Sequence, residues 1–153
     1  MKKILFVCHG NICRSPMAEY ILKNMVNKLE ISNDFEIHSA ATSREEIGND
    51  IYPPAKNCLN KHNVPFIRHY ARQITNKDLE YYDYIIAMED FNIQNLNRTV
   101  GDSDKYSLLL DYTDCPGNIS DPWYTGDFET AYKEIDKGCK CFLMKLGYEV
   151  KEV

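Results

Sequence analysis

One short segment of the sequence carries the residue types that reactions at phosphorus require. A cysteine and an arginine, Cys8 and Arg14, stand six positions apart in the run VCHGNICRSP. A thiolate is a good nucleophile, and a guanidinium can hold two phosphate oxygens with its planar fork. The spacing therefore predicts a loop that binds a phosphate group and places a cysteine for attack on phosphorus.

The patterns on either side of this segment are those that would position such a loop. Residues 3–7 are a short apolar run typical of a buried strand, and apolar residues recur at helical spacing over residues 16–29. We expect Ser15 to cap this helix and Pro16 to open it. Gly10 and Asn11 tolerate positive φ, so the loop can turn its amides inward at a helix N-terminus, where anions bind. This setting argues against a chance match in which the cysteine is only a buried apolar side chain.

The rest of the chain alternates between strand-like and helix-like segments. Strand patterns cover residues 34–41, 81–88 and 106–110, and helical patterns cover residues 55–62, 89–97 and 128–146, the last closed by Gly147. Residues 113–125 contain Pro116-Gly117 and Asp121-Pro122 and predict a long loop. The alternation indicates an α/β fold with a parallel sheet, whose ligands bind beyond the carboxyl ends of the strands. The loop after the first strand and the loop with Asp121 should meet there.

The composition indicates a single domain over residues 1–153. Hydrophobic residues make up 44% of the chain and charged residues 27%, so one core can form without a disulfide or a metal. A net charge of −5 argues against nucleic acid or a membrane as the partner, because both need a basic face. Six cysteines without a CxxC pair, and an N-terminal apolar run too short for a signal peptide, predict a cytoplasmic protein with reduced thiols.

Three cysteines near the end of the chain do not predict a metal site. Cys139 and Cys141 would point to different faces of the last helix, and no histidine lies nearby in sequence to join them and Cys115. Packing or surface thiols are the simpler interpretation.

Several motifs in order along the chain identify a family. The segment VCHGNICRSPMAE, together with SAATS, IGN, ARQIT, DYIIAM and DPWY at matching spacing, resembles the low-molecular-weight protein tyrosine phosphatases over the whole chain. The resemblance implies a three-layer sandwich: a central four-stranded parallel sheet flanked by helices, with the phosphate loop after the first strand. It also implies a phosphatase that needs neither metal nor cofactor.

The same resemblance assigns the chemical roles. It implies that Cys8 becomes a phosphocysteine and that Arg14 binds the phosphoryl oxygens. Asp121 would protonate the leaving group and then activate water. An Asp before Pro is also a common turn residue, and the DPWY match is what favours the catalytic role.

Other residues would bind the substrate or support the loop. The phosphate-binding loop comprises His9, Gly10, Asn11, Ile12, Cys13 and Ser15. Ser15 can donate to the sulfur, and Asn11 would hold the loop with His69 nearby, Glu19 as a second partner and Ser39 of the SAATS motif in support. Trp123 and Tyr124 would form aromatic walls.

The substrate implied by the resemblance is a phosphotyrosine-containing protein or a small aryl phosphate, with inorganic phosphate as product. Ile12 favours phosphotyrosine, because phosphoarginine-specific relatives carry Thr at the matching position. Glu45 stands where relatives often have an aromatic residue, and His9 replaces an apolar one, so both bear on substrate preference. The tyrosines give a hint of weak self-association.

Three alternatives compete with this interpretation. An arsenate reductase of the same fold would use Cys8 and Arg14, but it needs a further cysteine pair, which residues 89–97 lack. A phosphocysteine carrier that passes its phosphoryl group on would not need Asp121 or an aromatic wall. A phosphotyrosine-binding module without activity would be expected to lose Cys8 or Asp121, and both are present.

The position of Cys13 in the same loop as Cys8 predicts a redox role for Cys13. A neighbouring thiol can condense with a sulfenic acid on Cys8 and protect it from irreversible oxidation. We expect the positive field of Arg14 to reach Cys13 as well, with packing beneath the loop as the alternative role.

Overall fold

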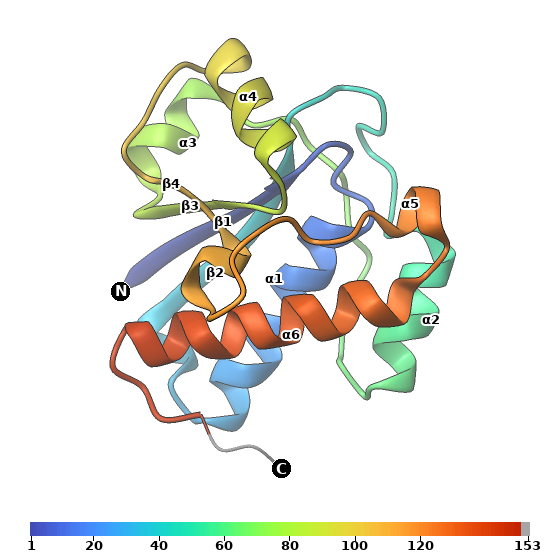
Figure 1. The fold of residues 1–153 in the computed structure, drawn as a ribbon, viewed down its shortest axis with the longest axis vertical. Coiled ribbons are helices and arrows are strands. Elements are labelled where there is room, and N and C mark those ends of the chain that lie inside the picture. Colours follow the sequence, from blue (N-terminus) through green and yellow to red (C-terminus); the bar gives the residue numbers. More distant parts are fainter. Residues whose placement is uncertain (151–153) are drawn as a thin grey trace.

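The central sheet runs through the whole molecule. A computed structural model describes residues 1–150. The strands are β1 (Lys2–Cys8), β2 (Phe35–Ala41), β3 (Tyr84–Ala87) and β4 (Tyr106–Leu108). All neighbours are parallel, in the order β2-β1-β3-β4 (Figure 1). The predicted four-stranded parallel sheet is confirmed.

Helices cover both faces of the sheet, which gives three layers (Figure 1). They are α1 (Arg14–Lys28), α2 (Pro53–Lys61), α3 (Asn76–Tyr81), α4 (Asp90–Thr99), α5 (Pro122–Thr125) and α6 (Phe128–Lys145), with single 3₁₀ turns η1 (Ser32–Asp34) and η2 (Leu109–Tyr112). Alternate residues of β1 face opposite layers, as strand geometry requires. Ile4 and Phe6 pack in the large core with α1 and α6, and Leu5 and Val7 pack in the smaller core on the other face. β1 is therefore the buried central strand, and the predicted phosphate loop follows its carboxyl end.

A glycine permits close packing on the side of α6. A Cβ at Gly138 would lie 2.5 Å from Cγ of Leu109 on η2. Because any side chain there would displace η2, α6 can approach the end of β4 only with glycine at this position. The predicted end of α6 is also confirmed, since Leu146 is the C-cap and Gly147 follows with a φ of +96°.

Two local predictions were wrong, and one short helix was not predicted. Helix α1 begins at Arg14 with Cys13 as N-cap, so Ser15 lies inside the first turn and uses its hydroxyl elsewhere. Residues 113–125 are not loop throughout, because Pro122–Thr125 form the short helix α5. The periodicity also missed α3, whose capping box joins Thr75 and Asp78 and is a readable start signal.

Candidate active site

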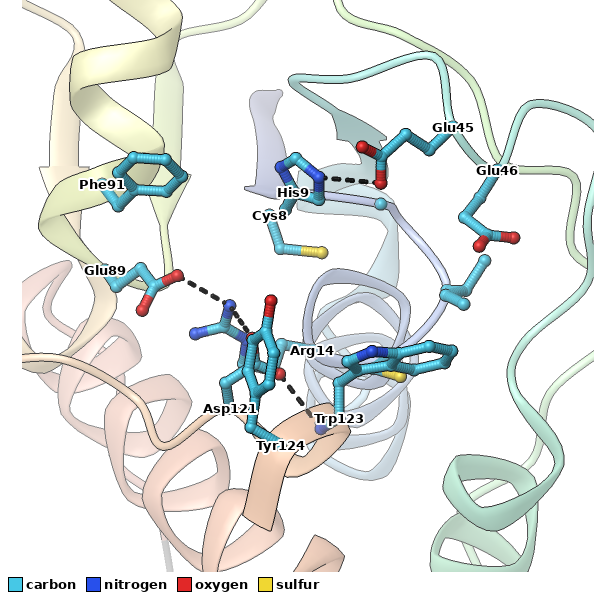
Figure 2. Close-up of a pocket in the computed structure, with 13 residues that line it drawn as sticks. Cys8, His9, Arg14, Glu45, Glu46, Glu89, Phe91, Asp121, Trp123 and Tyr124 are labelled. Atoms are coloured by element: carbon cyan, nitrogen blue, oxygen red, sulfur yellow. Dashed lines mark hydrogen bonds and ion pairs between the residues drawn. The ribbon is translucent and has the colours of Figure 1, made fainter. Parts of the chain in front are cut away.

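A cavity of about 290 Å³ opens at the carboxyl ends of β1 and β3 (Figure 2). Its lining comes from the loop between β1 and α1, the segment after β2, the start of α4 and the α5 segment. The lining residues are Cys8, His9, Gly10, Ile12, Cys13, Arg14, Glu45, Glu46, Glu89, Phe91, Asp121, Trp123 and Tyr124. The two loops expected to meet at this edge of the sheet therefore do meet.

Cys8 lies at the base of the loop, as the last residue of β1. Its sulfur accepts a hydrogen bond from the backbone N–H of Asn11 at 3.3 Å and lies 2.9 Å from the hydroxyl of Ser15. That hydroxyl already accepts from Nδ2 of Asn11 at 2.8 Å, so its own proton is available for the sulfur. Two hydrogen-bond donors thus converge on the Cys8 sulfur.

Asn11 holds the shape of the loop from inside the protein. It is fully buried and has a φ of +61°, a left-handed conformation that costs energy for a residue other than glycine. Its Nδ2 donates to Ser15 and to Oγ of Ser39, and its Oδ1 accepts from the backbone N–H of Arg72 at 3.2 Å and from Nε2 of His69 at 3.1 Å. These four side-chain bonds compensate for the strained backbone.

His69 is a structural partner of this loop. Its Nε2 also lies 2.8 Å from the backbone carbonyl of Asn11, so both neighbours of this nitrogen are acceptors and it must carry the proton. Burial lowers the pKa of His69, which favours the neutral ring. The ring therefore donates one shared hydrogen bond into the loop.

Glu19 reaches Asn11 only through an intermediate. The hydroxyl of Ser39 donates to Oε1 of Glu19 at 2.6 Å and accepts from Asn11, so a direct contact is replaced by a relay. Within residues 1–150, no hydrogen bond joins Glu19 directly to Asn11 or His69. Glu19 therefore supports Asn11 through Ser39, which lies between them.

Arg14 is almost fully buried and is oriented by three acceptors. It donates to Oε1 of Glu89 at 3.0 Å and to Oδ2 of Asp121 at 3.2 Å (Figure 2). It also donates to the carbonyl of Ile119 at 3.0 Å. The sequence argument missed Glu89. Its signal was its position, since an acidic residue that follows β3 lies at the same sheet edge as the loop after β1.

Asp121 serves as a helix cap and also faces the cavity. One carboxylate oxygen accepts from the backbone N–H of Trp123 at 3.1 Å and caps α5, while the other contacts Arg14. The turn interpretation and the site interpretation are therefore compatible. Trp123 is half exposed and packs on Tyr52 with 4.9 Å between ring centroids, and Tyr124 is exposed, so neither belongs to the core.

The rim opposite these aromatic rings is acidic. Nε2 of His9 lies 3.0 Å from a carboxylate oxygen of Glu45, and Glu46 lines the cavity beside them (Figure 2). A Cβ at Gly10 would lie 3.3 Å from Cγ of Glu46, so glycine leaves room for this side chain against the loop. The two residues singled out as departures from the family pattern thus contact each other at the entrance.

The pKa of the Cys13 thiol is set by burial more than by the charge of Arg14. It is buried, and burial raises the pKa of its thiol far more than the Arg14 charge lowers it. The positive field of Arg14 does reach Cys13 and lowers its pKa, but desolvation outweighs this effect. Cys13 is therefore a protonated thiol in the resting protein.

Comparison with known proteins identifies the class. Residues 3–152 match the family model of the low molecular weight phosphotyrosine protein phosphatases. The human protein named low molecular weight phosphotyrosine protein phosphatase is 40% identical over 153 residues, which cover 94% of this chain and 95% of the relative. The chain belongs to this family.

Solved structures agree in fold. The crystal structure of YfkJ from Bacillus subtilis is 36% identical with a TM-score of 0.91, over 95% of this chain and 94% of that one. The Drosophila arginine phosphatase DARP is 33% identical with a TM-score of 0.86, over 97% and 99% of the two chains. Among the helices of residues 1–150, none is long and apolar enough to cross a membrane.

Proposed function

We propose that this protein hydrolyses phosphotyrosine through a phosphocysteine on Cys8. One observation carries the proposal: Cys8, Arg14 and Asp121 line one cavity, with hydrogen-bond donors already aimed at the Cys8 sulfur. Family membership supports the same chemistry.

The first step is transfer of the phosphoryl group to sulfur. The Cys8 thiolate attacks phosphorus, the S–P bond forms and the P–O bond to the tyrosine oxygen breaks. Arg14 and the loop amides hold the equatorial oxygens, where negative charge is spread in the transition state. Asp121, at the mouth of the cavity, gives its proton to the leaving phenolate oxygen.

The second step hydrolyses the phosphocysteine and regenerates the free enzyme. The Asp121 carboxylate takes a proton from a water molecule while the oxygen of that water attacks phosphorus. The S–P bond then breaks, which releases inorganic phosphate and the Cys8 thiolate. The Ser15 hydroxyl stabilises the departing sulfur by donating to it. The contact of Asp121 with Arg14 keeps the carboxylate beside the phosphate position between the steps.

The substrate is proposed to be a phosphotyrosine-containing protein or a small aryl phosphate. Trp123 and Tyr124 supply aromatic surface for a phenol ring, and Ile12 adds an apolar contact at the loop. Glu45 and Glu46 at the rim should disfavour acidic peptides, weakly because exposed charges are screened. Phosphoarginine is the matched comparison substrate, since one relative is named an arginine phosphatase.

Other parts of the proposal follow from the sequence. The chain would act as one domain in the cytoplasm, with no metal or cofactor in the reaction and without nucleic acid or membrane as partner. Arsenate reduction is not favoured, because α4 carries no cysteine. Weak self-association through exposed tyrosines stays a prediction.

The direct test is hydrolysis of an aryl phosphate in the presence of a metal chelator, with Cys8→Ser as the matched variant. Wild type should turn over at an undiminished rate, and the variant should have none while vanadate still raises its melting temperature. Turnover by Cys8→Ser, or loss of wild-type activity with the chelator, would contradict the proposal.

A further inference from the structure

Outside the cavity, three side chains with metal-binding atoms converge where the C-terminal end of α2 meets the first turn of α6. Cys58 and His62 come from α2 and its C-cap, and Glu129 comes from α6. Sγ of Cys58, Nε2 of His62 and a carboxylate oxygen of Glu129 all lie within 4.8 Å of one another. Among residues 1–150, no other group of three such side chains has this arrangement.

Local structure fixes the directions of these side chains. Positions 58 and 62 are four residues apart, so they share one face of α2. The His62 ring stacks on Tyr132 of α6 with 3.8 Å between centroids and 7° between planes, which orients its Nε2 toward Glu129. That nitrogen lies 2.5 and 2.7 Å from the two Glu129 oxygens. The set is therefore held in place by packing as well as by charge.

We propose that Cys58, His62 and Glu129 bind one Zn²⁺ ion, with water as the fourth ligand. Thiolate, imidazole and carboxylate are the donor types that zinc takes in proteins, and three protein ligands with an open position are common. Tetrahedral zinc spaces its ligand atoms by about 3.3–3.7 Å, given bond lengths of about 2.0–2.3 Å. The distances between the three ligand atoms in this structure differ from the tetrahedral distances by roughly 1 Å, and rotation of the side chains can make up this difference.

The site also has the access and charge that zinc requires. The His62 and Glu129 side chains are 28% and 32% exposed, so solvent can reach the fourth position, while Cys58 is buried beneath them. On binding, the Cys58 thiol proton and the proton on Nε2 of His62 both pass to solvent. The neutral ring keeps its proton on Nδ1, and the Nε2 lone pair faces the ion. The thiolate and the carboxylate then balance the two charges of zinc. Lys61, whose Nζ lies 3.9 Å from Glu129, must turn to solvent.

Zinc at this position would tie α2 to the segment that carries the proposed acid. α6 begins three residues after α5 ends, and Tyr52, just before α2, packs on both Phe128 and Trp123. Because the ion binds the folded arrangement of two helices, it should stabilise the native state by an amount that grows with the logarithm of its concentration above Kd. The ion acts on stability and not in the phosphoryl transfer.

The first experiment is calorimetric titration of Zn²⁺ into the Cys8→Ser protein in a phosphine reductant. This background removes the cavity thiol as a competing ligand. We expect one ion per chain, an affinity at least tenfold weaker in His62→Gln, and no change in His38→Gln, whose exposed histidine also pairs with a glutamate. Equal affinity in His62→Gln, or absence of binding, would overturn the proposal.

The second experiment identifies the thiol and uses Co²⁺ as a probe. A cobalt–thiolate charge-transfer band should appear in the same background, persist in Cys141→Ser and vanish in Cys58→Ser. A band that survives Cys58→Ser would place the ion elsewhere and contradict the proposal.

Melting temperatures complete the test, each variant being compared with and without Zn²⁺. The ion should raise the melting temperature of the background protein by several degrees and leave that of Glu129→Gln unchanged. Because each protein is compared with itself, with and without Zn²⁺, the stability lost with the His62–Glu129 contact does not enter the difference in melting temperature. An equal rise in both proteins would overturn the proposal.

Discussion

The two sides of the cavity are built in opposite ways. On the phosphate side, Asn11 and Ser15 are fully buried and Arg14 is 2% exposed, and each is held by several hydrogen bonds. On the substrate side, Trp123 is 52% and Tyr124 84% exposed, and the short α5 has few restraints beyond its Asp121 cap. For the proposed function, this difference means that buried residues with fixed positions would bind the phosphate, whereas exposed side chains, which can be replaced with little loss of stability, would bind the rest of the substrate.

The largest expected effect on hydrolysis is that of replacing Asp121, which contacts Arg14 on the phosphate side and caps α5 on the substrate side. Asp121→Ala should slow hydrolysis of phenyl phosphate by roughly 10²–10⁴-fold, because a poor leaving group needs a proton. The loss in kcat/KM should be much smaller for p-nitrophenyl phosphate, whose leaving group departs unprotonated. Values of kcat/KM across a series of leaving groups measure this, because kcat/KM reports phosphoryl transfer to Cys8 and not the later hydrolysis of the phosphocysteine.

Asp127→Ala is the matched control for that prediction. Asp127 caps α6 through Thr130 as Asp121 caps α5, but it does not line the cavity. Its removal should leave the rates almost unchanged. Equal losses across all leaving groups in Asp121→Ala would reduce Asp121 to a helix cap.

Asn11 tests the buried side. Asn11→Ala should lower kcat by about tenfold or more and destabilise the fold by about 1–3 kcal/mol, because it keeps the strained φ and leaves buried partners unsatisfied. Asn11→Gly relieves the backbone strain but removes the same side-chain bonds. Kinetic assays measure kcat, and urea unfolding measures stability. If the glycine variant retained full activity and stability, the side-chain bonds would be unnecessary for the loop.

Cys13 tests whether a buried thiol can still protect the loop. After peroxide and then thiol reductant, wild type should recover most of its activity and Cys13→Ser several-fold less, because no disulfide intercepts the sulfenic acid on Cys8. The raised pKa of Cys13 should make this protection faster at high pH, where more thiolate forms. Equal recovery of both proteins would make Cys13 a packing residue.

The smallest effect belongs to the exposed rim. Glu45→Tyr should lower KM for aromatic phosphopeptides by a few-fold, because it adds an aromatic contact and removes the partner of His9. Glu80→Tyr, on the exposed face of α3, is the control and should change nothing. An unchanged KM in Glu45→Tyr would show that the rim does not contact the substrate.

The sequence predicted the sheet and the loop because their signals are local and continuous. A buried apolar run at β1, followed by Gly-Asn and a helical period, has few alternative structures. The partner of Arg14 was harder to predict. Glu89 lies 75 residues away in sequence, and only the strand order places it beside the loop.

The contacts that the sequence did not predict have a common physical cause. Ser15 has the residue type of an N-cap, yet α1 begins one residue earlier, at Arg14, and the Ser15 hydroxyl bonds to Cys8 and Asn11 of the curled loop. Similarly, Ser39 separates Glu19 from Asn11 because β2 pairs with β1 in the register that places Ser39 opposite Phe6. Such choices between competing partners are made by tertiary structure.

The central claim is that Cys8 carries the phosphoryl group. Asp121→Ala should form this intermediate rapidly from p-nitrophenyl phosphate and hydrolyse it slowly, because water then lacks its base. Acid quenching followed by peptide mass analysis should find one phosphoryl group, on the peptide with Cys8. An unmodified Cys8 peptide during steady turnover, or a phosphoryl group on another residue, would contradict the account.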